Sequence, residues 1–97
     1  MYGFEAPEDG FMTVEDWRIQ LWSKSEGPWA TLTINGPGAN PKEDIFIVKN
    51  YSENYDAFSW MQKNGFIVEV LKMVFIGDGT MVTCKIDVDK VKNYGKN

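Results

Sequence analysis

Short stretches in which apolar and polar residues alternate dominate this chain and restrict what it can fold into. They occur over residues 14–24, 29–35 and 81–88. Alternation with a period of two is the pattern of a β-strand that buries one face and leaves the other to solvent. Turn-forming Gly, Pro, Ser and Asp residues separate these stretches. The pattern therefore predicts an antiparallel sheet built from hairpins.

The first two stretches predict a hairpin around a turn at residues 25–28. The side chains expected to face the core are Trp17, Ile19, Leu21, Ala30, Leu32 and Ile34. Thr31 and Thr33 suit the solvated face of the sheet. Trp22 falls among the polar residues of its stretch. A tryptophan at such a position is a candidate binding residue.

The middle of the chain changes character twice. Residues 35–41 contain two Gly and two Pro and predict a loop. Residues 45–48 are uniformly apolar, which predicts a central strand covered on both faces. Over residues 52–64 apolar side chains recur every three positions, which predicts a helix, with Ser52 as its cap and Asn64-Gly65 as its end.

The last part of the chain predicts a second hairpin. Residues 73–76 and 81–88 form its strands around a turn at 77–80, whereas residues 69–72 fit a strand or an irregular segment. The apolar face of the final strand carries Val82, Cys84, Ile86 and Val88.

Together these elements predict one α+β domain of 97 residues, with an antiparallel sheet of about five strands and one helix packed on one face. The body would span residues 14–88. Residues 1–13 are expected to form an irregular acidic arm, and residues 89–97 a polar tail.

Composition narrows the possible functions. Hydrophobic residues make up 43% of the chain, which excludes general disorder. Ten Lys and Arg stand against fourteen Asp and Glu, for a net charge of −4. A protein that binds nucleic acid through phosphate contacts needs a clustered cationic surface, so this balance disfavours that class. The chain contains no histidine, the commonest general base and metal ligand.

No motif predicts catalysis, a cofactor or a metal. Asp87 and Asp89 could share one face of a strand, but they have no third ligand. The Gly-x-Gly sequences at 36–38 and 77–79 do not continue into a phosphate-binding motif, and turns explain them. Cys84 lies on an apolar face with no histidine to activate it, so we expect a core cysteine. The chain is expected not to be an enzyme.

Aromatic residues and acids supply the candidate interaction site. Aromatics make up 14% of the chain, and large rigid side chains are enriched at protein interfaces. The candidate protein-interaction residues are Trp22, Trp29, Thr31 and Trp60, together with Glu8, Asp9, Glu15 and Asp16. Packing under loops is an alternative interpretation of each tryptophan, and stacking on nucleic-acid bases is a third.

The order of motifs resembles a known family. The carrying segments are Ala30-Thr31-Leu32-Thr33-Ile34-Asn35 with its Gly/Pro loop, Glu43-Asp44-Ile45-Phe46-Ile47, a short helix ending at Asn64-Gly65, and a final strand through Cys84-Lys85-Ile86. This order is similar to a small domain-of-unknown-function family encoded on conjugative elements and phages of gut bacteria. The resemblance covers about residues 15–88 and assigns no catalytic residue. It implies an accessory protein of a mobile element, of a kind that binds and inhibits host defence enzymes.

The expected function is therefore a non-enzymatic protein-interaction module, with an anti-CRISPR or anti-restriction inhibitor of a host nuclease as its expected form. The alternative is a small nucleic-acid-binding accessory protein that stacks aromatics on bases. The acidic start of the chain is unlike a secretory signal, and no apolar run is long enough to span a bilayer, so a cytoplasmic location without membrane partners is expected. Formation of a homodimer through a sheet edge is compatible with each of these functions.

Overall fold

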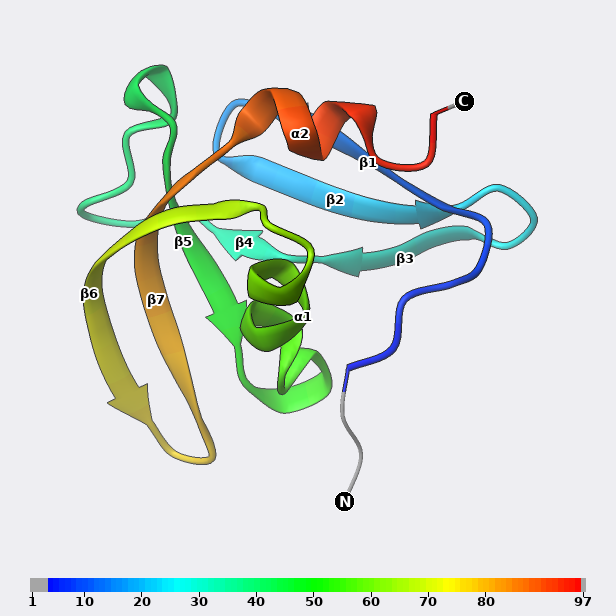
Figure 1. The fold of residues 1–97 in the computed structure, drawn as a ribbon. Helices are drawn as coiled ribbons and strands as arrows, with labels where there is room; N and C mark the ends of the chain where they lie inside the picture. The colour runs from blue at the N-terminus through cyan, green and yellow to red at the C-terminus, as the bar shows by residue number, and fades with distance from the viewer. Residues whose placement is uncertain (1–3, 97) are drawn as a thin grey trace.

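The computed structural model describes residues 4–96 and contains two antiparallel sheets (Figure 1). The three-stranded sheet has the order β1-β2-β3, and the four-stranded sheet the order β4-β5-β7-β6. The strands are β1 (Gly10–Glu15), β2 (Arg18–Ser23), β3 (Gly27–Thr31), β4 (Thr33–Ile34), β5 (Ile45–Asn50), β6 (Ile67–Ile76) and β7 (Gly79–Ile86). The helices are α1 (Ala57–Lys63) and α2 (Val88–Asn93), with short 3-10 turns at Pro41–Glu43 and Ser52–Asn54.

The α+β class is confirmed, but the prediction of one sheet of about five strands is wrong. The sheets separate at Leu32, between β3 and β4. The Leu32 N–H donates to the Ile19 carbonyl on β2 at 2.9 Å, and the Leu32 carbonyl accepts from the Lys49 N–H on β5 at 2.8 Å. One residue thus bonds to both sheets. A strand that passes from one sheet to another in this way makes the corner of a two-sheet fold.

The predicted single strand over residues 14–24 is also wrong. A turn at Asp16, whose φ is 52°, divides it into β1 and β2, which pair with each other. Asp tolerates this left-handed conformation, so the turn needs no glycine. Ile19 and Leu21 are fully buried as predicted, whereas Trp17 lies in the turn and is only half-buried. The predicted irregular arm is wrong from Gly10 onward, because β1 begins there; residues 1–3 lie outside the described part.

The polar tail prediction is wrong because residues 88–93 form a second helix. The Asp87 carboxylate caps this helix by accepting from the Lys90 N–H at 3.1 Å. Val91 is fully buried and Val88 packs against the core, although Val88 was expected on a strand. The helix has only six residues, too few for a clear helical period.

The predicted helix over residues 52–64 is shorter than expected. Ser52 has φ 57° and begins a 3-10 turn without capping it, and α1 starts only at Ala57. The predicted end is confirmed, because α1 stops at Lys63 and Gly65 adopts φ 76°.

Two further predictions about strands are confirmed. β5 lies between β4 and β7, and its residues Phe46, Ile47 and Val48 are all buried. The loop at 35–41 passes close to Ile47, which explains why the outer face of β5 is covered at this residue. The second hairpin is also confirmed, with β6 and β7 joined at Gly77-Asp78.

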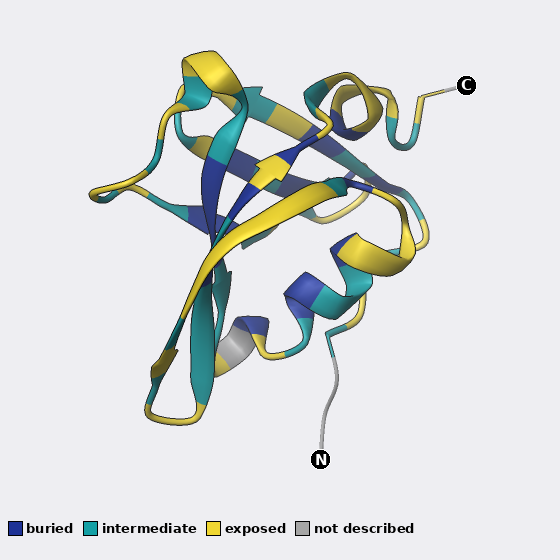
Figure 2. Ribbon diagram, turned by 60° about the vertical axis from the view of Figure 1, so that its left-hand side comes forward, coloured by how far each residue is buried: buried dark blue, intermediate teal, exposed yellow. Residues whose placement is uncertain are grey.

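The core lies where the inner faces of the two sheets meet α1 and α2 (Figures 1 and 2). Its largest fully buried side chains include Phe46, Met12, Ile19, Leu21, Leu32 and Met61. Thr33 is also buried, although it was expected on the solvated face. Its hydroxyl accepts from the Ile19 N–H and donates to the Trp17 carbonyl, both at 2.8 Å, so burial leaves it satisfied.

Candidate functional site

The three-stranded sheet turns one face to the core and the other outward. Its outward side chains include Phe11 and Thr13 on β1, Gln20 and Trp22 on β2, and Thr31 on β3, and we call this set the outer aromatic face. Alternation explains the division, because Met12, Ile19 and Leu21 occupy the intervening positions and are buried.

Hydrogen bonds and ring stacking hold the outer aromatic face rigid. Phe11 and Trp22 are cross-strand partners whose ring centroids lie 6.2 Å apart at 12°. The Trp22 indole N–H donates to Thr13 Oγ1 at 2.9 Å. The Thr31 hydroxyl donates to Gln20 Oε1 at 2.6 Å. The two candidates Trp22 and Thr31 thus lie on one pre-organised surface.

Acidic residues lie at both ends of this sheet. Glu15 and Asp16 are exposed at the β1–β2 turn, while Glu8 is exposed just before β1 and Asp9 lies beside it. β1 is six residues long, so these ends are about 17 Å apart at roughly 3.4 Å per residue. Arg18, opposite Glu15, lies over the Trp17 ring at 5.1 Å. The aromatic pair therefore lies between two acidic ends.

The charge of the whole chain is concentrated in this part of the sequence. Residues 1–31 contain six acids and two bases, whereas residues 32–97 contain eight of each. The net charge of −4 therefore belongs entirely to the segment that builds the three-stranded sheet. In the folded chain, α2 packs against β1 and brings Lys90 and Lys92 to the same part of the molecule, so the negative charge available to a cationic partner is that of the exposed acids at the ends of the sheet.

Asp9 has a structural role within this acidic end. Its carboxylate accepts from the Ser23 hydroxyl and from the Ser25 N–H, each at 2.8 Å, and so ties the segment before β1 to the β2–β3 turn. Hydrogen bonds from Ser25 and Ser23 lower the pKa of Asp9 below its ordinary value of 3.8, because they favour the charged form.

This lowered pKa predicts a stability change in acid. A carboxyl whose folded pKa lies below its unfolded pKa adds stability above the unfolded value, and that contribution disappears as the pH falls through the folded value. We expect the stability lost in Asp9→Asn to be largest above pH 3.8 and to shrink below it. Urea unfolding across this pH range measures it. Glu8→Gln is the control, and equal pH dependence in the two variants would refute the role of Asp9.

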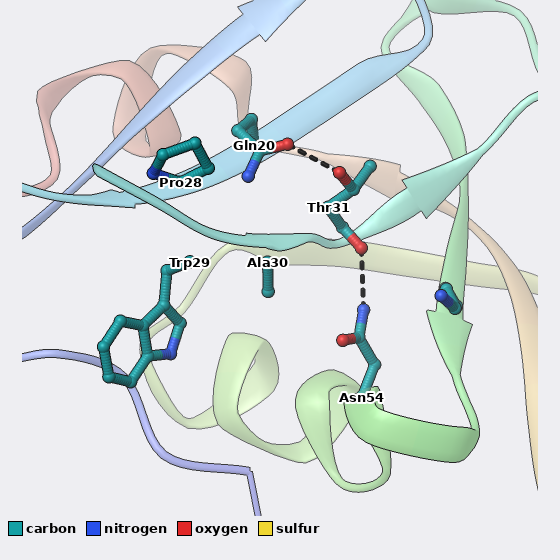
Figure 3. Close-up of a pocket in the computed structure, with 7 residues that line it drawn as sticks. Gln20, Pro28, Trp29, Ala30, Thr31 and Asn54 are labelled. Atoms are coloured by element: carbon teal, nitrogen blue, oxygen red, sulfur yellow. Dashed lines mark hydrogen bonds between the residues drawn. The ribbon is translucent and has the colours of Figure 1, made fainter. Parts of the chain in front are cut away.

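Trp29 does not lie on the outer aromatic face; it lies at the free edge of β3, on the side away from Gln20. Its side chain is 40% exposed, and its indole N–H donates to the Glu5 carbonyl at 3.0 Å. Figure 3 shows Trp29 and Ala30 on one side of β3 and Gln20 and Pro28 on the other. A pocket of about 320 Å³ wraps around this edge. The Asn54 amide donates to the Thr31 carbonyl at 2.7 Å and forms part of its lining.

Trp60 does not join the other candidates. It lies on α1, half-buried in an aromatic cluster, with its ring centroid 5.5 Å from Phe4, 5.7 Å from Phe66 and 5.5 Å from Tyr94. Phe4 and Tyr94 lie near the two ends of the described part, and Phe66 directly precedes β6. Sequence spacing gave no signal for this cluster, because it depends on the tertiary fold.

Cys84 is buried in the core on β7, and burial raises the pKa of its thiol to about 12. A neutral thiol is a poor nucleophile. Among the side chains of residues 4–52 and 54–96, no group of three or more acidic or cysteine residues lies close enough to hold a metal ion.

The Cys84 thiol should therefore resist alkylation in the folded protein. We expect iodoacetamide to modify it at pH 8 only after denaturation, with mass spectrometry as the readout. Labelling of the folded protein at the rate of the denatured chain would contradict the burial of this side chain.

One exposed feature was missed from the sequence. Five of the seven large apolar side chains exposed in the described part lie on β6. Residues 69–72 did not read clearly as a strand because two bulges interrupt the alternation, one between Ile67 and Glu69 and one between Val70 and Lys72. The signal for this strand in the sequence is a run of apolar residues at 67–76 that is interrupted only by the single charges Glu69 and Lys72.

Comparison with known proteins gives no relative: no family model matches this chain, and neither a curated protein nor a solved structure is similar to it. Among the described residues, no helix is both long enough and apolar enough to span a membrane. The function must therefore be inferred from the surface itself.

Proposed function

We propose that this chain is a non-enzymatic protein-binding module whose outer aromatic face engages a basic surface on another protein. The carrying observation is the Phe11–Trp22 stack between two acidic ends, in the segment that holds all of the net charge. Rigid aromatic side chains bury large areas at low entropic cost, and complementary charge speeds and orients association.

The partner we infer is a nuclease-type defence enzyme of a host cell. Such enzymes carry cationic surfaces that bind phosphates. An acidic surface about 17 Å long would compete for that cationic surface. An anti-CRISPR or anti-restriction inhibitor is the specific form of this proposal.

A purified CRISPR effector nuclease and a purified restriction enzyme are the probes for this proposal. Binding is measured by isothermal titration calorimetry, and inhibition by DNA cleavage. Trp22→Ala is expected to weaken binding about thirtyfold, because a central aromatic contact contributes about 2 kcal/mol. Circular dichroism verifies that the variant is folded.

Charge reversal provides a matched pair of variants. Glu8→Lys with Glu15→Lys changes one exposed acid at each end of the sheet, whereas Glu43→Lys with Asp78→Lys makes the same charge change elsewhere. We expect only the first pair to weaken binding to the nuclease and to make that binding less dependent on salt concentration. Equal losses in both pairs would refute the proposed face. Binding to single-stranded DNA instead of protein would favour the nucleic-acid alternative.

A further inference from the structure

The open edge of the four-stranded sheet carries an apolar surface that the proposed function does not use. β6 pairs only with β7 and lies at the margin of the fold (Figure 1). Figure 2 shows it exposed along most of its length. The exposed fractions are 60% for Val68, 42% for Val70, 48% for Leu71, 44% for Met73 and 80% for Phe75.

Natural proteins protect edge strands with proline, short length, charged side chains or β-bulges. β6 has ten residues, no proline and two charged residues, Glu69 and Lys72, and its two bulges are the one further protective feature it carries. Its backbone groups on the side away from β7 are available to another strand. The length and composition of this edge therefore suit pairing with a second strand.

The pairing of β6 with β7 fixes which side chains share a face. Val70 lies opposite Cys84 and Met73 opposite Val82, so both are on the core side of the sheet. Glu69 lies opposite Lys85 and Lys72 opposite Thr83, so both are on the outer side. The bulge between Val70 and Lys72 makes Glu69 and Lys72 consecutive positions of that outer side.

This arrangement is self-complementary in antiparallel pairing. With a two-fold axis through Val70, Val70 meets Val70 of a second copy, and Glu69 of each copy meets Lys72 of the other. On the core side, Ile67 meets Met73. Opposite charges therefore face each other twice, and apolar residues meet apolar ones. Within the described part of the chain, neither Glu69 nor Lys72 has an ion pair or a side-chain hydrogen bond of its own.

We propose that a second copy of this chain occupies the edge of β6, so that two four-stranded sheets join into one continuous sheet. The two-fold axis passes through Val70, and two Glu69–Lys72 pairs fix the register. Strand pairing supplies backbone hydrogen bonds, and the exposed apolar side chains supply buried area. The dimer does not depend on the proposed function, because β1–β3 form the other sheet.

Charge variants test both the dimer and its register. Glu69→Lys alone and Lys72→Glu alone place like charges opposite each other, so each is expected to weaken the homodimer about tenfold at low salt. An equimolar mixture of these two variants restores opposite charges and is expected to form a heterodimer as tight as the wild-type dimer. The double variant with both substitutions is also expected to form a homodimer as tight as that of the wild type.

Sedimentation velocity over a concentration series gives the dissociation constants, with circular dichroism verifying the fold. Val70→Asp places a charge in the middle of the apolar edge and should abolish any dimer that pairs through β6. A wild-type chain that stays monomeric at every concentration overturns the proposal. If Val70→Asp leaves the dimer unchanged, the interface lies elsewhere. If the single charge variants do not weaken the dimer, this register is wrong. Nuclease binding by Val70→Asp reports separately on the proposed function.

Discussion

Leu32→Ala is expected to lower the free energy of unfolding by about 3–5 kcal/mol, near the upper end for a buried leucine. Leu32 is fully buried between the two sheets, and its backbone groups bond to Ile19 on one side and Lys49 on the other. Because both sheets hold this backbone in place, the site has little freedom to collapse around the cavity that alanine leaves.

Urea unfolding followed by tryptophan fluorescence measures this loss. Leu71→Ala is the matched control, since Leu71 is 48% exposed on β6 and its truncation should cost less than about 1 kcal/mol. Both variants are compared at a concentration at which the chain is monomeric. Similar losses at Leu32 and Leu71 would mean that the two sheets do not share a core at Leu32.

Thr33→Val is expected to cost about 2–4 kcal/mol, although valine has nearly the same shape as threonine. The substitution removes both bonds of a buried hydroxyl and leaves the Ile19 N–H and the Trp17 carbonyl without their partner. An unsatisfied polar group in a core costs its full desolvation energy.

Thr31→Val, two positions away, is the control for this prediction. The Thr31 hydroxyl donates to the Gln20 side chain on a half-buried surface, where water can replace it. We expect a loss below about 1 kcal/mol there. Thermal unfolding of both variants gives the comparison, and equal stability of Thr33→Val and the wild type would contradict the role of the hydroxyl.

Local pattern was sufficient for part of the fold. The uniformly apolar residues 45–48 correctly predicted the central strand β5, because burial on both faces demands such a run. Gly77-Asp78-Gly79 correctly predicted the turn between β6 and β7. In both cases the physical requirement acts on neighbouring residues.

The remaining elements depend on contacts between distant residues. The turn between β1 and β2 contains no glycine or proline, and Asp16 alone is too weak a turn signal to mark it. Leu32 divides the sheets through bonds to residues 13 and 17 positions away, which alternation cannot reveal. Thr33 looked solvent-facing because the polarity of its side chain hid the two bonds that allow its burial.

The candidate site was likewise only partly visible in the sequence. The position of Trp22 among polar residues correctly singled out the outward face of β2. Its stacking on Phe11 depends on the β1–β2 register, which only the fold supplies. Trp60 showed the same compositional signal but packs in a cluster with both ends of the chain.

The most direct test of the central claim is a titration of the wild-type chain into a nucleic-acid-free CRISPR effector nuclease, repeated with DNA in the basic channel of the enzyme. We expect a stoichiometric complex that weakens as salt increases and that bound DNA displaces. A complex of unchanged affinity on the DNA-filled enzyme would contradict this claim.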